Sequence, residues 1–536
     1  MGFFNFRKLI KFFTMRFIEG MFVIALIVIM PSLPPYGEYT GYTITPPKPL
    51  EGSLAVNTLL EKAEKLFEGK ISGPESFTDY NGELYMSVVG GQVLKYNPRL
   101  DKLSLVVSFS SDKCVGYHTE PECGRPLGLK FDNNGNLFVI ETYSGIWKVD
   151  VKTGKKQLLI SKKDEIDGKP INLPNALAIA KNGDIYWTDS SSEYELRDII
   201  YSLIADGTGR LFRYSAATKK NEVLIDKINF ANGVSLSEKE DFVIVCDLVK
   251  SRVLRYYLQG PKKGTHDVFI DGIPGLPDNI SSNKRGGFFI GLVMSHDANH
   301  PNLLQVFSRF SLIRKLVARL IGLIDFGLKT INDYYPNYYA AVGMHYVGML
   351  RPMPLITPKR STVLEIDNDG NIIRSFHALN GIISNICEGY VFDNHLYLGS
   401  PYNDYLARVK LSILGINLNE KPIRVTQESA TKQQPTTTPK PTTTTPKPTT
   451  TTPKPTTTTP KPTTTTPKPT TTPKPTTTPK PTTTPKPTTT PKPTTTPKPT
   501  TTPKPTTTSP KPKPTTVPPS QQAPSPSKPV KIKNEL

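Results

Sequence analysis

The chain has 536 residues and a formal net charge of +20, and this charge is unevenly distributed. Residues 431–536 hold 17 lysines against one acidic residue, Glu535, and so carry +16, which leaves +4 for residues 1–430. Because the part that can fold is close to neutral, it lacks the basic footprint of a nucleic-acid-binding protein, and nucleic acid is excluded as a partner.

Residues 1–35 predict a cytosolic basic stub followed by a signal-anchor helix that spans a membrane. An apolar stretch, 17–30, ends before three prolines, and four basic residues precede it: Arg7, Lys8, Lys11 and Arg16. Its uninterrupted part, Met21–Met30, is shorter than the roughly 20 residues of a membrane span, and a cleaved signal peptide has a similar pattern. No small-x-small cleavage site follows, however, and positive residues before the apolar run favour a cytosolic N-terminus. We therefore expect a single-pass type II membrane protein.

Residues 36–70 predict a linker with one short amphipathic helix over 54–68. Five apolar residues at helical spacing indicate it: Leu59, Leu60, Ala63, Leu66 and Phe67.

A repeat begins after this linker, and each of its six units reads as a turn, an apolar strand, a second turn and a second strand. The units are 81–96, 134–149, 182–214, 242–257, 286–366 and 393–409. Asn-Gly pairs beginning at Asn81, Asn134 and Asn182 supply the positive φ that tight turns need. Six self-similar units predict an all-β fold, a six-bladed β-propeller over 71–412, and they argue against a β-sandwich.

The fifth unit is interrupted by an insertion over 296–360. Within it, residues 303–326 are apolar at helical spacing. Four basic residues lie between the apolar ones: Arg309, Arg314, Lys315 and Arg319. A helix packed as a cap over the propeller explains the pattern, and so does a lid whose basic rim also touches an anionic membrane surface. The Tyr, Pro and Asn cluster at 333–339 predicts a loop.

Residues 413–536 predict a disordered, mucin-like tail. Residues 435–516 repeat Pro-Thr-Thr-Thr-(Thr)-Pro-Lys, which cannot bury a core and suits an extended rod. Such tracts in a secretory protein carry O-linked glycans, so we expect glycans and extracellular ligands as partners, with an unmodified flexible tail as the alternative. The ending Lys533–Leu536 resembles the KDEL retrieval signal, so the endoplasmic reticulum competes with the cell surface, which we favour.

Two of the four cysteines, Cys114 and Cys123, stand nine residues apart in a polar loop. In the oxidising compartment that the N-terminus predicts, this spacing closes a small disulfide, whereas in a cytosolic protein both would be free thiols. Cys246 lies within an apolar strand and is expected to be a buried small residue. Cys387 has no evident partner.

Four oxygen-bearing side chains stand at matching places, each just before a new apolar strand: Glu75, Asn175, Asn232 and Asp278. In a propeller, the loops at these places meet at one end of the central channel. Two carboxylates and two amides suit Ca²⁺, leave it nearly neutral, and keep positions open for water or substrate. Any one of these residues alone is an ordinary turn signal, but four at matching places favour a metal site.

Six motifs, in this order, resemble the strictosidine synthase-like family. They are Gly73–Ser76, Cys123–Gly128, Leu173–Asn175, Trp187–Ser191, Phe230–Val234 and Pro274–Asn279, and the resemblance covers roughly residues 54–412 and the anchor. It implies a six-bladed propeller related to paraoxonase and diisopropyl fluorophosphatase, in which Glu, Asn and Asp residues bind a central calcium. The resemblance therefore implies Glu75, Asn175, Asn232 and Asp278 as ligands, with Asn279 as a candidate further ligand.

The chain departs from the resembled enzymes at catalytic positions. Paraoxonases carry a catalytic His where this chain has Leu127, and none of its seven histidines is an evident replacement. Glu388 lies near the glutamate that strictosidine synthase uses, so it is a catalytic candidate, but the local spacing differs and Pictet–Spengler condensation is the least favoured activity. The membrane-anchored relatives imply a weak arylesterase-like activity, with Asp278 as base or nucleophile.

Two classes of function follow. One is a calcium-dependent hydrolase of small esters, which the complete set of oxygen ligands favours. The other is a non-catalytic surface binding or adhesion mucin with a structural calcium, which the tail favours.

Overall fold

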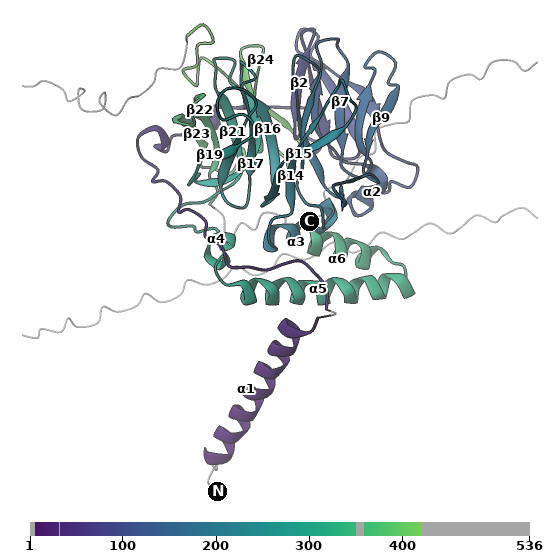
Figure 1. Cartoon of the computed structure of the whole chain (residues 1–536), viewed down its shortest axis with the longest axis vertical. Coiled ribbons are helices and arrows are strands. Elements are labelled where there is room, and N and C mark those ends of the chain that lie inside the picture. Colours follow the sequence, from purple (N-terminus) through teal and green to yellow (C-terminus); the bar gives the residue numbers. More distant parts are fainter. Residues whose placement is uncertain (1–5, 32, 350–357, 421–536) are drawn as a thin grey trace, which may run out of the picture. The chain divides into compact units, whose positions relative to one another are not determined.

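The computed structural model describes residues 6–31, 33–349 and 358–420. The predicted tail lies outside the described residues from residue 421 onward, and so does the Lys533–Leu536 ending. The described part is mostly β-structure, with one long N-terminal helix and three helices inserted within a single sheet (Figure 1).

The N-terminal helix α1 runs without a break from Phe6 to Ile29. Its stretch Lys8–Ile29 is long and apolar enough to cross a membrane, by length and composition, and none of its most apolar window is buried in the protein. A signal sequence near an N-terminus passes the same test. The helix is longer than the apolar run Met21–Met30 because it also includes the basic residues that precede that run.

The segment 52–66 does not form the single helix predicted over 54–68. Two short 3₁₀ turns, η1 (Gly52–Leu54) and η2 (Leu59–Lys62), are followed by strand β1 (Glu64–Leu66). Leu60 is fully buried, and β1 pairs antiparallel with β26 (Leu406–Lys410) at the far end of the folded chain. Tertiary pairing therefore overrides the helical spacing of the apolar residues.

Six four-stranded antiparallel sheets make up most of the described structure. In the first five, the strands lie in chain order, which is what short hairpin turns between sequential strands produce. The first three sheets contain β2 (Phe77–Tyr80), β3 (Glu83–Val88), β4 (Gln92–Asn97) and β5 (Lys102–Ser108); β6 (Pro126–Phe131), β7 (Leu137–Glu141), β8 (Gly145–Val149) and β9 (Lys156–Ser161); and β12 (Pro174–Ile179), β13 (Ile185–Asp189), β14 (Gly209–Tyr214) and β15 (Asn221–Ile228).

The remaining three sheets follow the same order until the chain closes. They contain β16 (Ala231–Leu236), β17 (Phe242–Asp247), β18 (Arg252–Tyr257) and β19 (His266–Ile270); β20 (Gly275–Ser282), β21 (Phe288–Ser295), β22 (Ser361–Ile366) and β23 (Ile372–Ala378); and β24 (Glu388–Phe392), β25 (His395–Gly399) and β26, with β1 as the outer strand. A small hairpin, β10 (Glu165–Ile166) with β11 (Lys169–Pro170), stands apart from them.

The first strands of the six sheets contact one another in a closed cycle. β2 contacts β6, and the cycle continues through β12, β16, β20 and β24 before it returns to β2. Apolar side chains fill the space between neighbouring sheets, as where Ile244 and Val253 pack against Ile290 and Leu364. Each such buried side chain stabilises the fold by about 1.5–3 kcal/mol, so the ring is held by the layers between sheets. The first strands therefore form a closed ring.

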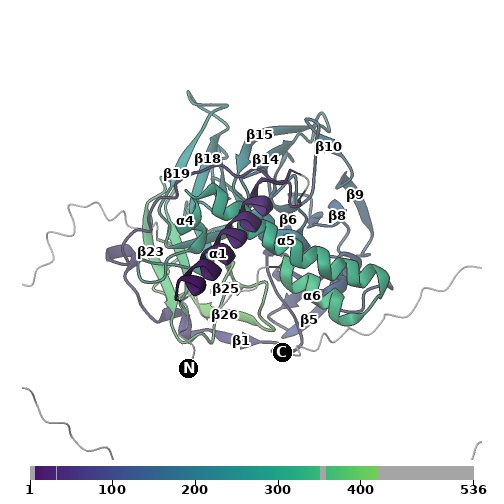
Figure 2. The same cartoon turned by 90° about the horizontal axis from the view of Figure 1, so that it is seen from below.

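Three helices lie within the insertion between β21 and β22 and gather on one end of the sheets (Figures 1 and 2). They are α4 (Leu303–Phe307), α5 (Ser311–Tyr334) and α6 (Tyr338–Gly348). The predicted helix over 303–326 is thus two helices, of which the second extends to Tyr334. The loop predicted at 333–339 is shorter than expected, because Asn337 caps α6 by accepting a hydrogen bond from the Ala340 amide at 2.9 Å.

Two of the four basic residues predicted to form a rim on this helix are buried. The Arg314 guanidinium donates to the carbonyl oxygens of Ile204 and Thr40, each at 2.9 Å, and pairs with Asp206 at 2.6 Å. Arg319 Nη1 donates to the carbonyl oxygens of Ile27, at 2.6 Å, and Val28, at 2.9 Å. The prediction of an outward basic rim is wrong at these two positions, which instead fasten α5 to the protein and to the end of α1.

Residues after the predicted end of the fold at 412 still belong to the core. Leu414 and Ile416 are buried in the apolar cluster of the last sheet, and the Ile416 amide donates to the Leu411 carbonyl oxygen at 2.9 Å. The Arg374 guanidinium also donates to the Gly415 carbonyl oxygen at 2.8 Å. The folded part therefore ends later than predicted.

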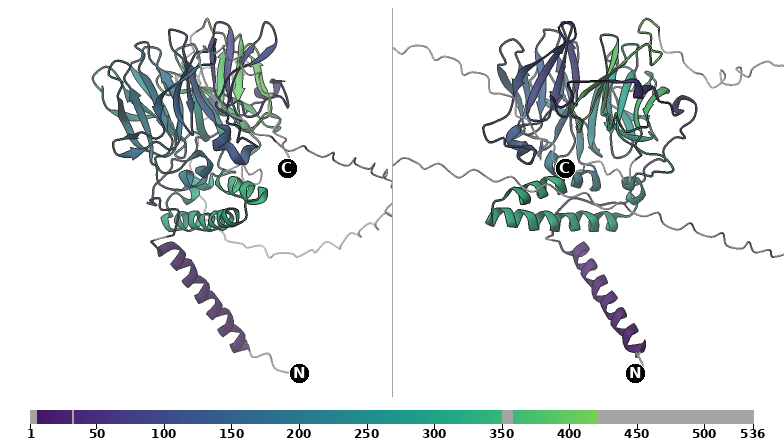
Figure 3. Two further views of the ribbon diagram at one scale, coloured as in Figure 1. Left: turned by 90° about the vertical axis from the view of Figure 1, so that its right-hand side faces the viewer. Right: turned by 180° about the vertical axis from the view of Figure 1, so that it is seen from behind.

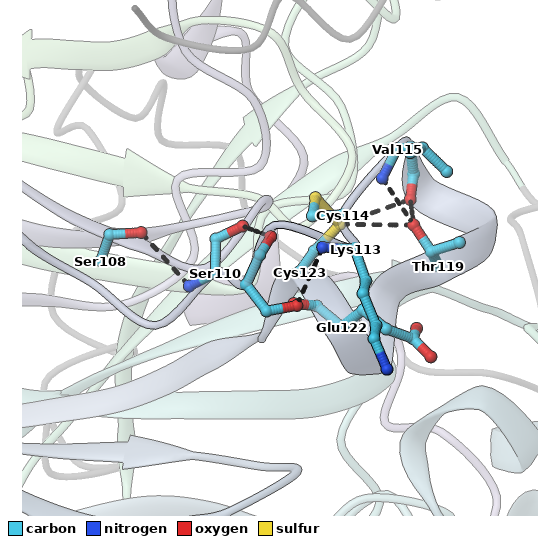
Figure 4. Close-up of a disulfide and its surroundings, with 10 residues drawn as sticks. Ser108, Ser110, Lys113, Cys114, Val115, Thr119, Glu122 and Cys123 are labelled. Atoms are coloured by element: carbon cyan, nitrogen blue, oxygen red, sulfur yellow. Dashed lines mark hydrogen bonds between the residues drawn. A yellow bond between two sulfur atoms is a disulfide. The ribbon is translucent and has the colours of Figure 1, made fainter. Parts of the chain in front are cut away.

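A disulfide joins Cys114 and Cys123 in the loop between β5 and β6, with the Cα atoms 4.6 Å apart (Figure 4). Cys123 ends the short helix α2 (Glu120–Cys123) and is buried. The Thr119 hydroxyl accepts from the Val115 amide at 3.0 Å and donates to the Gly116 carbonyl oxygen at 2.8 Å. The bond and these local contacts close a compact loop directly before Arg125.

Candidate functional site

Three of the four predicted ligands lie inside the first strands of their sheets, whereas the sequence predicted them just before those strands. Asn175 is in β12, Asn232 in β16 and Asp278 in β20, and in each strand the pairing register shifts across the residue. Such a bulge turns a side chain away from the regular alternation of a strand. The bulges therefore point these side chains into the ring, while Glu75 stands two residues before β2.

All four predicted ligands line one cavity of about 180 Å³. Asn175, Asn232 and Asp278 come from three different sheets and Glu75 from the segment just before a fourth, and each of the four is buried. The remaining wall is largely apolar and includes Leu127, Phe230, Leu248, Leu276 and Val293. The structure thus brings the sequence-predicted set together at one place.

Two oxygens of this set are buried and have no hydrogen-bond partner in the described protein: Asn232 Oδ1 and Asp278 Oδ1. The Asn175 amide is held differently: its Nδ2 donates to Ser190 Oγ at 3.0 Å, and Ser190 in turn donates to the Ala231 carbonyl oxygen at 2.6 Å. That relay fixes the amide nitrogen toward Ser190 and directs the amide oxygen away from it. Buried oxygens without partners are costly unless a donor or a cation satisfies them.

The pKa of Asp278 is raised well above its usual range. Burial is the main cause, and the charges of Glu75 and Glu388 add to it, while the Asn232 side chain partly offsets them. A carboxyl group in this position binds a proton or a cation more readily than an exposed one does.

Arg125 is the main residue of the cavity that the sequence analysis did not assign, although it stands in the quoted motif Cys123–Gly128. Its Nη2 lies 2.7 Å from Glu75 Oε2, and its Nη1 lies 3.3 Å from Glu120 Oε1. Burial opposes its charge, but Glu75 and Glu120 outweigh this and raise the pKa of Arg125. The signal available in the sequence was the place of this arginine within that motif.

The net charge of the side chains around the cavity suits a divalent cation. Arg125 balances one of the three carboxylates Glu75, Glu120 and Asp278, and the pKa of Glu120 is raised by its burial. With all three ionised, the cavity carries two uncompensated negative charges. Since Ca²⁺ prefers oxygen ligands and carries two positive charges, the residues present fit it. The described residues contain no group of three or more His, Cys, Asp and Glu side chains that could hold a metal. The predicted ligand set does not meet that criterion, because two of its four members are amides.

Helix α6 also contributes to the cavity, which the sequence analysis did not foresee. His345 and the neighbouring Met349 both line it. Because α6 is apolar on all sides, its helical spacing gives no amphipathic signal from which to predict which face turns inward.

Two other predicted site residues lie elsewhere in the ring. Glu388 is not among the residues that line the cavity: its Oε2 accepts from the Phe77 amide at 2.9 Å, and its Oε1 from the Ser281 hydroxyl. Asn279 follows Asp278 but also lies outside the cavity lining, with its amide donating to the Cys387 carbonyl oxygen at 2.9 Å. Neither residue lines the cavity, although Asn279 adjoins Asp278 in the chain and the charge of Glu388 contributes to the raised pKa of Asp278.

The amino-acid sequence matches known family models in two stretches. Residues 52–96 match the strictosidine synthase-like N-terminal model, and residues 175–261 match the strictosidine synthase model. The chain is 41% identical over 402 residues to adipocyte plasma membrane-associated protein Hemomucin of Drosophila melanogaster, which covers 74% of this chain and 69% of the relative. The chain belongs to the strictosidine synthase-like family.

Vertebrate members of this family are also similar to the chain. Adipocyte plasma membrane-associated protein of Bos taurus is 34% identical over 364 residues, covering 67% of this chain and 81% of the relative. Among solved structures, a gluconolactonase from Xanthomonas campestris has a TM-score of 0.42 and 14% identity, covering 70% of this chain and 98% of that one. A calcium-binding regucalcin from Agrobacterium tumefaciens has a TM-score of 0.40 and 11% identity, covering 64% and 92%.

Proposed function

We propose that the six sheets form one six-bladed β-propeller, that its cavity binds Ca²⁺ through Glu75, Asn175, Asn232 and Asp278, and that it hydrolyses small esters. The observation that carries the proposal is that four oxygen-bearing side chains, at or just before the first strands of four sheets, line one cavity, with two buried oxygens lacking a protein partner. The closed cycle of first strands supports the propeller.

Several features of the cavity support ester hydrolysis. When bound there, Ca²⁺ supplies a Lewis acid that draws electron density from an ester carbonyl. Arg125 holds the Glu75 carboxylate in place, and the Asp278 carboxylate takes the proton of the attacking water. The apolar wall around Leu127 and Phe230 takes the acyl or aryl group and excludes bulk water.

The test is hydrolysis of an aryl acetate by the purified full-length protein, with and without a calcium chelator. We expect the chelator to abolish the activity, added Ca²⁺ to restore it, and Asp278→Asn to lose it. The matched control is Asp184→Asn, which makes the same carboxylate-to-amide change at a buried position outside the cavity lining and should keep the activity. Activity that survives both the chelator and Asp278→Asn would exclude this function.

A second candidate is a cell-surface binding protein in which Ca²⁺ is only structural. The threonine-rich stretch over 435–516 favours it, because an O-glycosylated stalk displays glycans and needs no catalytic centre. In that case Ca²⁺ would raise the stability of the protein in the same assay series, and no ester would be turned over.

We also propose that α1 anchors the protein as a single-pass type II membrane protein with its sheets and tail outside the cell. The length and apolar character of α1 support this, as does the similarity to proteins named for their association with the adipocyte plasma membrane. Protease added to intact cells should remove the tail. Protection of the tail until the cells are permeabilised would instead indicate an internal membrane.

A further inference from the structure

A second cavity, of about 360 Å³, lies between the inserted helices and the end of the sheets. Its volume is within the range of roughly 300–1,000 Å³ that is common for small-molecule sites. The lining comes from α3 (Ile199–Ile204), α4 and α5 and from the end of β21, and it is almost entirely apolar. Apolar residues that line it include Ile200, Ile204, Leu304, Phe307, Val317 and Ile321.

One polar side chain in this lining has no protein partner. His296 is only 4% exposed, and neither Nδ1 nor Nε2 of its ring has a hydrogen-bond partner in the described structure. Because burial and the charge of Arg360 lower the pKa of His296 to about 4, the ring is neutral at physiological pH, with one donor and one acceptor nitrogen. A buried group of this kind is stabilised by a ligand that offers the matching hydrogen bonds.

The charged groups near this cavity are already paired, so they do not select a charged ligand. Arg314 lines the cavity, but its nitrogens donate to three carbonyl oxygens and to Asp206. Arg360 pairs with Asp297 at 2.6 Å and donates to the His296 carbonyl oxygen at 3.1 Å. The ligand chemistry that fits is therefore an apolar chain with an uncharged polar head.

The helix that covers the cavity also joins the candidate membrane span. Arg319, two residues after cavity-lining Val317, holds the end of α1 through the Ile27 and Val28 carbonyl oxygens. The same helix exposes apolar side chains to solvent, with Leu320 at 43% and Ile324 at 57% exposure. Figure 3 shows α5 between the sheets and the end of α1 in two further views. A ligand dissolved in a membrane would meet the protein at this helix.

From these observations we propose that the cavity beneath α4 and α5 binds a single-chain neutral lipid. The chain lies among the apolar side chains, and the hydroxyl head forms a hydrogen bond with one ring nitrogen of His296. The cavity shares Leu203, Leu276 and Met294 with the wall of the candidate metal cavity, so the two spaces adjoin. This proposal does not depend on ester hydrolysis, so the two functions are tested separately.

The experiment uses the full-length protein in phospholipid nanodiscs and measures equilibrium binding of a tritiated medium-chain fatty alcohol, which cannot be hydrolysed. Empty nanodiscs give the background. We expect saturable binding to one site per chain. Val317→Trp fills the cavity and should weaken the affinity at least tenfold. The matched control is Leu320→Trp, because Leu320 lies on the same helix with nearly the same exposure, 43% against 40% for Val317, but does not line the cavity.

A second variant tests the head group. His296→Phe keeps a ring of similar size and removes no hydrogen bond within the described protein, so the protein should fold as before. It should weaken binding of the alcohol by about 3–10-fold, the equivalent of one hydrogen bond, and should leave binding of the corresponding alkane unchanged. Binding no greater than in empty nanodiscs, or equal losses in Val317→Trp and Leu320→Trp, would overturn the lipid site. Tighter binding of the fatty-acid anion than of the alcohol would overturn the neutral head.

Discussion

Arg125 Nη2 lies 2.7 Å from Glu75 Oε2, and both side chains are almost completely buried. A buried ion pair contributes little net stability, but removing one partner leaves the other charge uncompensated. The consequence of breaking this pair therefore depends on whether a cation is present to take the place of the guanidinium.

Replacing Arg125 with Met is expected to destabilise the protein by about 3–5 kcal/mol in the presence of a chelator, because Glu75 then remains buried without a counter-charge. Saturating Ca²⁺ should recover part of this loss. The midpoint of guanidinium unfolding, with and without Ca²⁺, measures both quantities. Arg252→Met is the control, since it breaks the Asp247 pair outside the cavity lining, and Ca²⁺ should not rescue it more than the wild type.

Replacing Asp278 with Asn is expected to weaken Ca²⁺ binding at least about tenfold, or about 1.4 kcal/mol. One of the two carboxylates of the proposed ligand set is lost, and its buried oxygen becomes part of a neutral amide. Isothermal titration with CaCl₂ measures the affinity. Asp184→Asn, at a buried position outside the cavity lining, should bind as the wild type does, and an unchanged affinity in Asp278→Asn would remove the proposed site.

Replacing both Cys114 and Cys123 with Ser is expected to lower the free energy of unfolding by about 2–3 kcal/mol, as for the loss of a short disulfide loop. A reducing agent should destabilise the wild type by the same amount and leave the double variant unchanged. Non-reducing peptide mapping of the native protein identifies the bond directly. Two free thiols in that map would contradict the prediction.

Asn279 is expected to carry no N-linked glycan, although Asn279–Ser281 is an acceptor sequence. It is 6% exposed and lies in β20, with its amide bonded to the Cys387 carbonyl oxygen in the ring interior. Gel mobility of Asn279→Gln made in a secretory host should equal that of the wild type. A faster-migrating variant would show that the acceptor is exposed and would also contradict the position of Asp278 next to it.

The stability of the protein is expected to fall as the pH is lowered from about 6.5 to 4, in part because of His296. Burial and Arg360 lower the pKa of this side chain from 6.5 to about 4, although Asp297 opposes them. In this window the unfolded chain binds a proton that the folded protein does not. The contribution of His296 to the free energy of unfolding is therefore complete above pH 6.5 and is lost toward pH 4. The loss amounts to about 3 kcal/mol at most. The unfolding midpoint of His296→Phe should depend less on pH over the same window, and an identical dependence would contradict the prediction.

The strands were predictable because local chemistry and burial agree. Asn81, which precedes β3, has a positive φ of 51°, as an Asn-Gly turn requires. The apolar residues that follow such turns are the buried strands β3, β7 and β13. The candidate ligands could be found for a related reason: residues at the same phase of a repeat occupy equivalent places around a ring.

What the sequence analysis missed depends on contacts between distant segments. The apolar spacing of 54–68 resembles a helix, but pairing of β1 with β26 decides its structure. Arg314 and Arg319 resemble an exposed rim until the carbonyl oxygens of other segments are found around them. The register shifts that turn Asn175, Asn232 and Asp278 inward have no signal in the residues alone, because a bulge is defined by the partner strand.

The pairing of β1 with β26 also delays completion of the last sheet while the chain is being synthesised on the ribosome. Glu64 and Arg408 are paired across a sequence separation of 344 residues, so the outer strand of the last sheet is made long before its partner. At roughly 5–20 residues per second, the wait is about 17–70 s. During that time β1 has an unpaired edge, and the cycle of sheets is open between β2 and the place that β24 will fill. We therefore expect chaperones to protect the nascent chain until its last folded residues emerge.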